Sequence, residues 1–236
     1  MIRLKRLIFI LGFMACFISA DKMTAQKFNQ FDENKNRTGV WRKYYSNKRI
    51  RYQGKFVNGK EVGVFKFYDR SISSFPIIIK NFSSSSDSLF VQFFTLKGIL
   101  QSEGAMNGKQ REGTWYYYFV DGKILSEENY TNGKLEGEVV NYYPDGKVAE
   151  RSIYKNGLKN GLSRKYSNKE ICIEEVVFAL GKENGLAKYF ELDGNLKEAG
   201  TYKEGSRVGE WAYYLEGEIA PDSLKKAQRG TFKKKN

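Results

Sequence analysis

Residues 113–137 read GTWYYYFVDGKILSEENYTNGKLEG, and this stretch decides the fold. Two turn signals divide it, Asp121-Gly122 and Asn132-Gly133, and both dipeptides favour the tight turns of β-hairpins because their central residues adopt positive φ. The segments between the turns are rich in Tyr, Ile and other residues that favour strands. No apolar period of 3.6 residues runs through the stretch, which argues against a helix. The stretch therefore predicts strand, turn, strand, turn.

The same pattern recurs along almost the whole chain. Similar units begin near positions 39, 63, 89, 113, 137, 161, 185 and 209, at intervals of 24 residues except for two extra residues between 63 and 113. Neighbouring strands joined by short turns pair in antiparallel fashion. We therefore expect an all-β fold, an elongated array of antiparallel β-hairpins with about 16 strands. It forms a single domain over residues 26–236.

Fixed positions within the unit predict which side chains share a face. The residue five positions after the start of each unit is aromatic in all eight units. The residue two positions after the start is Trp in three units, at Trp41, Trp115 and Trp211. Since side chains alternate along a strand, positions two and five are expected on opposite faces, and positions eleven and seventeen on one face. Cys172 stands at position eleven in a row of Ile, Val and Leu, so we expect it to be structural.

The composition narrows the possible chemistry. The chain of 236 residues contains no His, which excludes a Ser-His-Asp triad, a Cys-His pair and any His-ligated metal site. The acidic pairs Glu127-Glu128 and Glu174-Glu175 suggest the two carboxylates of a glycosidase. Adjacent residues of a strand, however, point to opposite faces and do not converge on one substrate. We expect no enzymatic activity, no cofactor and no metal.

The first residues have the layout of an export signal. A basic segment, residues 2–6, precedes the apolar run Leu7–Ala20, which is short for a membrane span. We predict a signal peptide over residues 1–25, with cleavage after Ala25. Cys16 is a rival site, as the anchor of a lipoprotein. The expected protein is therefore exported, periplasmic or extracellular, with no transmembrane span in the mature chain.

The repeat units carry a family resemblance. The pattern Gly-x-Trp-x-x-Tyr-Tyr-x-Asp-Gly-Lys, followed by Tyr-x-Asn-Gly-Lys-x-x-Gly, resembles the MORN-repeat variant, found in bacterial proteins often labelled YwqK-type antitoxins. The resemblance covers about residues 28–232. It implies a non-enzymatic hairpin array that acts as a binding or scaffolding surface. The antitoxin label implies neutralisation of a toxin, although an export signal fits poorly with a cytoplasmic antitoxin. Cell-wall choline- or glucan-binding repeats are a rival resemblance, but their units run closer to 20 residues.

Two sets of residues are candidates for binding. A protein partner is predicted at exposed aromatic side chains, because Trp and Tyr dominate interface hot spots; the alternative is that these side chains stack on neighbouring strands and stabilise the sheet. This set is Trp41, Trp115, Tyr116, Tyr117 and Trp211. The mature chain has 36 Lys and Arg against 26 Asp and Glu, which favours an anionic surface such as acidic lipid or polysaccharide. The candidate residues for binding such an anionic surface are the lysines beside turn glycines, which are expected along the two rims of the array: Lys60, Lys109, Lys123, Lys134, Lys147 and Lys159. Nucleic acid is not expected as a partner of an exported protein.

Two segments depart from the repeat. Residues 71–88 contain Pro76 and a run of serines in place of the usual turn signals, which indicates either a partner-binding protrusion or a decayed repeat. Residues 216–230 interrupt the last unit and are expected to cap the array, because terminal repeats need a modified end.

Overall fold

A computed structural model describes residues 27–82 and 88–220, and all regular structure in these ranges is β-strand. The seventeen strands follow one another along the chain. They are β1 (Gln30–Phe31), β2 (Arg37–Tyr44), β3 (Ile50–Val57), β4 (Lys60–Tyr68), β5 (Pro76–Phe82), β6 (Ser88–Phe94), β7 (Leu100–Asn107), β8 (Gln110–Tyr118), β9 (Ile124–Thr131), β10 (Lys134–Tyr142), β11 (Val148–Lys155), β12 (Leu158–Tyr166), β13 (Cys172–Ala179), β14 (Lys182–Phe190), β15 (Leu196–Lys203), β16 (Ser206–Leu215) and β17 (Glu218–Ile219).

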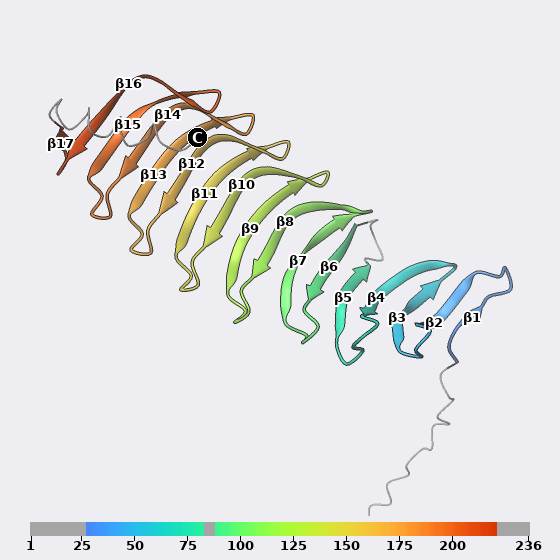
Figure 1. The fold of residues 1–236 in the computed structure, drawn as a ribbon. Helices are drawn as coiled ribbons and strands as arrows, with labels where there is room; N and C mark the ends of the chain where they lie inside the picture. Colours follow the sequence, from blue (N-terminus) through green and yellow to red (C-terminus); the bar gives the residue numbers. More distant parts are fainter. Residues whose placement is uncertain (1–26, 83–87, 221–236) are drawn as a thin grey trace, which may run out of the picture.

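Every strand pairs in antiparallel fashion with its predecessor and its successor in the sequence. Figure 1 shows the result, a long twisted row of curved hairpins that runs from β1 at the blue end to β17 at the red end. The short strands β1 and β17 lie at its two ends. The predicted all-β array of antiparallel hairpins is confirmed.

The turns form two different rims. On one, which we call the tight rim, two-residue turns such as Asn132-Gly133 join the strands, and both residues have positive φ (51° and 78°). The Gly133 amide also donates to the Arg111 carbonyl at 3.0 Å, so each turn of this kind is bonded to the unit before it. On the other, the wide rim, five-residue turns such as 119–123 are closed by bonds like Phe119 N–H to Lys123 O at 2.8 Å. The two extra residues of the second unit lie in the wide-rim loop 69–75.

A β-bulge next to each wide-rim turn changes which side chains share a face. Lys165 pairs with Glu174 but Tyr166 pairs with Cys172, so Ile173 is an extra residue that interrupts the alternation. Cys172 consequently lies near Arg164 and Glu175, on the face opposite to position seventeen. The expectation that positions eleven and seventeen share a face is therefore wrong.

Cys172 is half-buried, and this burial raises the pKa of its thiol. A raised pKa keeps the thiol protonated, as in a structural cysteine. Positions two and five lie on opposite faces as predicted. Trp115 packs against Tyr130 on one face, whereas the Tyr118 hydroxyl donates to Glu103 on the other.

One row of side chains forms the core of this single-layer sheet. Position two of each unit pairs with position fifteen of the same unit, which places these residues side by side on one face, here called the inner face. Phe65, Val91, Trp115 and Ala187 of this row are fully buried. Two clusters result, one around Val91 and Trp115 and one around Ala187 and Trp211.

The side chains of this row match one another in size. Gly104 lies directly against the Trp115 ring, since a Cβ on Gly104 would stand 2.5 Å from it, and Gly200 lies in the same way against Trp211. At Ala187 the row has no aromatic ring, and the residue opposite on the neighbouring strand is the larger Val176 instead of a glycine. Between the two clusters the row contains the buried Val139 and a polar pair, Ser152 and Ser163, whose buried hydroxyls bond to each other at 2.7 Å.

Some predicted features lie outside the described residues. They include the signal peptide 1–25, Cys16, residues 83–87 of the serine-rich segment and the end of the expected cap after residue 220. Within the described ranges, no helix is long and apolar enough to cross a membrane.

Candidate functional site

The aromatic candidates are placed mainly in the core. Trp115 is 0% exposed and Trp211 is 7% exposed, so the expectation that they are exposed contact residues is wrong, and the alternative of stacking within the sheet holds for both. Trp41 is half-buried, and its indole N–H donates to the Gln30 and Thr38 carbonyls at 3.1 Å. Tyr116 and Tyr117 are half-buried and, as neighbours in β8, lie on opposite faces.

Each Trp is covered by an arginine four residues before it. The guanidinium carbon lies 5.1 Å from the ring centroid for Arg37 and Trp41, 4.7 Å for Arg111 and Trp115, and 3.8 Å for Arg207 and Trp211. These are cation–π distances, and the cation explains why the rings are shielded from solvent. These arginines are not among the residues predicted from the sequence, although Arg-x-Gly-x-Trp occurs three times and units without Trp lack the Arg.

The six candidate lysines lie along both rims, as expected. Lys123 and Lys147, on the wide rim, pair with Asp121 and Asp145 at 3.6 and 3.9 Å. On the tight rim, Lys159 pairs with Glu150. The other three tight-rim lysines, Lys60, Lys109 and Lys134, form no ion pair with any residue of the two described ranges.

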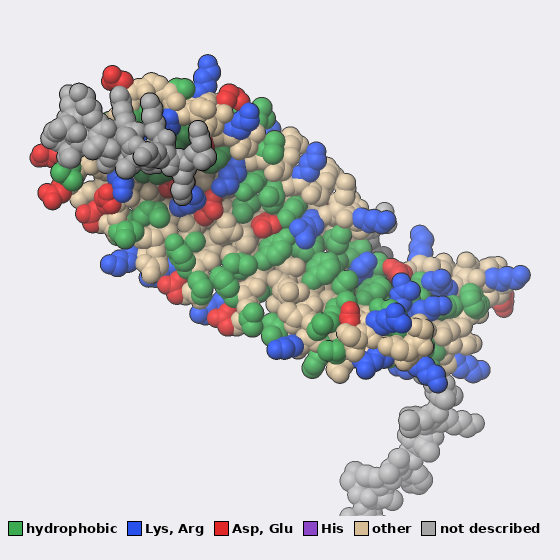
Figure 2. All heavy atoms as spheres, in the orientation of Figure 1, with side chains coloured by type: hydrophobic (Ala, Val, Ile, Leu, Met, Phe, Trp, Pro, Cys, Tyr) green, Lys and Arg blue, Asp and Glu red, His purple; other side chains and the backbone are tan. Residues whose placement is uncertain are grey.

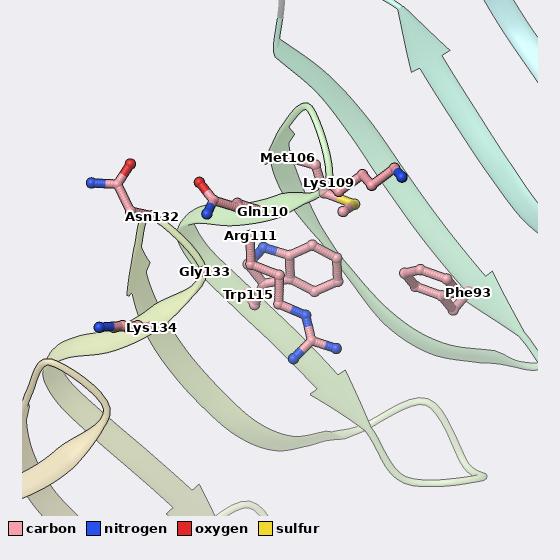
Figure 3. Close-up of a pocket in the computed structure, with 9 residues that line it drawn as sticks. All are labelled: Phe93, Met106, Lys109, Gln110, Arg111, Trp115, Asn132, Gly133 and Lys134. Atoms are coloured by element: carbon pink, nitrogen blue, oxygen red, sulfur yellow. The ribbon is translucent and has the colours of Figure 1, made fainter.

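Lys109 and Lys134 both line a cavity of about 590 Å³, and their side chains extend to opposite sides of it (Figure 3). Figure 3 shows the Arg111 guanidinium beside the Trp115 ring, with Lys109 from the preceding turn and Lys134 from the following turn to either side. We call this cavity the basic pocket. Its lining residues are Phe93, Met106, Lys109, Gln110, Arg111, Trp115, Asn132, Gly133 and Lys134. It brings together one aromatic and two lysine candidates that the sequence analysis had assigned to different partners.

The floor of the basic pocket is rigid. The Trp115 indole N–H donates to the Ala105 carbonyl at 2.8 Å, and its ring meets Tyr130 edge-on, with centroids 6.4 Å apart. Arg111 is fixed above this floor by its bond to the Tyr130 hydroxyl at 3.0 Å and by the rings of Trp115 and Tyr117. Since Trp115 itself is covered, a ligand here meets the Arg111 guanidinium and the two lysines rather than the indole.

Arg111 has no direct carboxylate partner among the described residues, unlike its counterpart Arg207, and the Glu128 carboxylate is linked to it only through the Tyr130 hydroxyl. Arg207 forms two bonds to Glu198, at 2.8 and 3.0 Å. Burial opposes its charge, but the bonds to Glu198 and Tyr202 raise the pKa of Arg207 above its ordinary value. Four units earlier along the row that holds Glu198, Ser102 replaces the carboxylate. In residues 27–82 and 88–220, Arg111 forms no ion pair.

The basic pocket therefore has the features of an anion-binding site. Three cations line it, no carboxylate does, and the amides of Gln110 and Asn132 offer further hydrogen bonds. A guanidinium held by packing loses little freedom when it binds a carboxylate, which favours binding by Arg111.

The acidic pairs do not form a catalytic dyad. Glu128 accepts a bond from Tyr130 on the inner face, whereas Glu127 accepts one from Tyr142 at 2.9 Å on the other face. Glu174 and Glu175 likewise pair with Lys165 and Arg164, which occupy opposite faces. Among the described residues, no group of His, Cys, Asp and Glu is arranged to hold a metal ion.

Comparisons with known proteins give a family match and distant matches among solved structures. The MORN repeat variant matches at residues 37–58, 111–132, 135–156 and 183–204. No curated protein sequence matches the chain. Among solved structures, a crystal structure of a mutant of S. aureus TarM in complex with Fondaparinux, alpha-GlcNAc-glycerol and UDP aligns with a TM-score of 0.26 and 15% identity, over 52% of this chain and 19% of that one. The chain thus spans about a fifth of the length of that protein.

Proposed function

This chain carries repeats of the MORN variant, and from that premise we propose that it is a non-enzymatic binding protein whose basic pocket holds an acidic segment of a protein partner. MORN repeats fit a protein that binds protein or membrane surfaces. The observation that carries the proposal is that Arg111, in a pocket also lined by Lys109 and Lys134, has no direct carboxylate partner in the described ranges, where the equivalent Arg207 is bonded to Glu198. An Asp or Glu side chain of a partner would take the place that Glu198 takes beside Arg207.

The shape of the site supports a protein ligand over a small molecule. The pocket is open and lies on a sheet face, whereas sites for small molecules bury most of the ligand in a concave cavity. A rigid arginine over aromatic rings is a common hot spot of protein interfaces. The exposed amides of Gln110 and Asn132 suit the polar backbone of a bound peptide segment.

We further propose that the protein acts after export, either free or anchored at Cys16, and that its partner is met in the cell envelope. The layout of residues 1–25 supports export, and an antitoxin-like role would make the partner a toxin. Mass spectrometry of the protein from its host distinguishes the two forms: an N-terminal Gln26 supports cleavage after Ala25, and a diacylated Cys16 supports the anchor.

The pocket is tested by reversing its two exposed lysines. We expect Lys109→Glu/Lys134→Glu to lower partner recovery from the native envelope by at least about tenfold, because the acidic segment then meets like charges. The matched control is Lys155→Glu/Lys203→Glu, which makes the same charge change at exposed lysines of the tight rim outside the pocket. Equal recovery by both variants, with unchanged melting temperatures, would contradict the proposal.

A second candidate function is binding of an acidic lipid or polysaccharide by the tight-rim lysines. The observation that favours it is the lack of ion pairs at Lys60, Lys109 and Lys134 within the described ranges. Many exposed single contacts would make such binding steeply sensitive to salt. Binding to a polysaccharide or vesicle that is undiminished at high ionic strength would contradict it.

A further inference from the structure

A second cavity, of about 490 Å³, shares the Phe93 side chain with the basic pocket. We call it the apolar hollow. It opens where β5 and β6 meet the turn after β6, and Ile77, Ile78, Phe93, Phe94 and Leu96 supply its apolar lining, to which no charged side chain is added. Leu96 is 44% exposed, so solvent reaches the hollow. Figure 2 shows hydrophobic side chains gathered over this part of the array, around β5–β8.

The hollow is uncharged because of one row of the inner face. Ile78 in this row pairs with Phe67 on one side and with Phe93 on the other. In later units the place of Ile78 holds a carboxylate, at Glu150, Glu174 and Glu198, and each of these forms an ion pair. The inner face is therefore apolar beside the basic pocket and charged further along the array.

The two cavities are close enough for one short segment to reach both. The Arg111 guanidinium and the Phe93 ring lie 4.7 Å and 6.1 Å from the same Trp115 ring, so they are within about 11 Å of each other. Figure 3 shows Phe93 to one side of Trp115, at the edge of the basic pocket.

This distance sets the spacing of the side chains that would fill the two cavities. An extended segment rises ~3.3 Å per residue and its side chains alternate, so two side chains on the same side of the segment lie ~7 Å apart at a spacing of two residues and ~13 Å apart at a spacing of four. The spacing of four carries an apolar side chain past the Phe93 ring and into the hollow, whereas the spacing of two falls short of that ring.

We propose that the acidic segment of the partner also carries a large apolar side chain, four residues from its acidic residue, and that this side chain occupies the apolar hollow. The inference rests on the proposed function, because it extends the same site. The acidic residue meets Arg111, while the apolar side chain covers Phe93 and Leu96. An exposed charge pair contributes little affinity by itself, whereas a buried apolar side chain contributes more. The site therefore selects for the pair of residues and not for negative charge alone.

The test uses the full chain and fluorescein-labelled synthetic peptides of nine residues, with one Glu and one Phe among Ser and Gly. Fluorescence anisotropy compares the peptide that has Glu and Phe four residues apart with two control peptides. In one control the spacing is three, which turns the Phe to the opposite side of an extended segment, and in the other Ser replaces the Phe. We expect the peptide with spacing four to bind at least about tenfold more tightly than either control.

A variant of the hollow provides the second arm. Leu96→Ser should weaken binding of the peptide with spacing four by about fivefold and leave binding of the peptide without Phe unchanged, because only the former loses an apolar contact. The control Leu192→Ser removes a leucine that is 69% exposed and has the same place in a later wide-rim turn, so it should bind both peptides like the wild type.

Equal affinity of the wild type for all three peptides would overturn the inference, and so would the absence of binding by the peptide with spacing four at about 1 mM. Lys109→Glu/Lys134→Glu separates this result from the proposed function. Binding that this variant abolishes but that does not depend on the Phe would overturn the inference and support the acidic site. Binding that depends on the Phe but neither on these lysines nor on the Glu of the peptide would contradict both.

Discussion

At the residue scale, the arrangement that defines this sheet is an aromatic ring lying on a glycine. Trp115 fits its site only because Gly104 has no side chain, and Arg111 closes the site from the other side. The three contribute together, because the ring supplies buried area, the glycine supplies space and the guanidinium adds a cation–π contact. Trp211 repeats this design with Gly200 and Arg207, and Trp41 shares the arginine, Arg37.

Gly104→Ala tests the fit directly. We expect a loss of unfolding free energy on the order of 2–3 kcal/mol, since a methyl group 2.5 Å from the ring forces the ring or the strand to move. Trp115→Val alone should also destabilise, by about 3 kcal/mol, through lost burial. For the double variant Gly104→Ala/Trp115→Val, chemical denaturation should show a loss of unfolding free energy that is smaller than the sum of the two single losses by about 1 kcal/mol or more. Strict additivity would show that the two sites are independent.

At the element scale, the polar middle of the inner face depends on Glu150. This carboxylate accepts bonds from Ser152 at 2.8 Å and from Lys159, and the Ser152 hydroxyl is buried against Ser163. Burial raises the pKa of Glu150, but the bonds from Lys159 and Ser152 outweigh it, so the pKa lies below its ordinary value. The strands β11 and β12 are therefore joined by hydrogen bonds where other strands are joined by apolar side chains.

Glu150→Gln should lower the unfolding free energy near neutral pH by about 1–2 kcal/mol, because the charge-assisted bonds are lost. A depressed carboxyl pKa stabilises the fold above the unfolded-state pKa, and this stabilisation is lost as pH falls through the folded-state pKa. The difference between the wild type and the variant should thus shrink in acid, below about pH 4. Urea titrations over a pH series measure it.

Glu138→Gln is the matched control for this prediction. Glu138 pairs with Arg151 at 3.1 Å, but both side chains are more than 40% exposed, so the same charge change should cost less than about 1 kcal/mol. If both variants lost the same stability, the buried hydroxyl network would have no special role.

At the scale of the whole molecule, the array is linked only through neighbours. Each strand pairs with the strands before and after it, and no pairing joins distant units of the described sheet. The clusters around Trp115 and Trp211 are separate, with the polar pair Ser152 and Ser163 between them. Stability should then be a sum of local terms, as in other repeat proteins.

Gly200→Ala tests this independence. The added methyl group would stand 2.2 Å from the Trp211 ring and should loosen the cluster that Val176, Ala187 and Trp211 form. Hydrogen exchange should accelerate in β13–β16 and stay unchanged in β6–β9. A uniform increase along the array would instead indicate one cooperative unit.

The sequence by itself determined the repeat, the strands and the two rims. These features are local, since Asn132-Gly133 and Asp121-Gly122 impose their turns through the φ values of adjacent residues, and the 24-residue period carries them along the chain. The tertiary structure alone decided which faces the side chains occupy. The bulge at Ile173 moved Cys172 off the face that simple alternation assigns to it.

The basic pocket likewise depended on register. Lys109, Arg111 and Lys134 come from separate turns and strands. Arg111 lacks a direct carboxylate partner because Ser102 on the neighbouring strand stands where Glu198 stands beside Arg207. Trp115 is predicted to be an exposed anchor because Trp is common at interfaces, yet Val91, Tyr130 and Arg111 pack against it. Burial and charge balance are properties of residues brought together across strands, so no local pattern determines them.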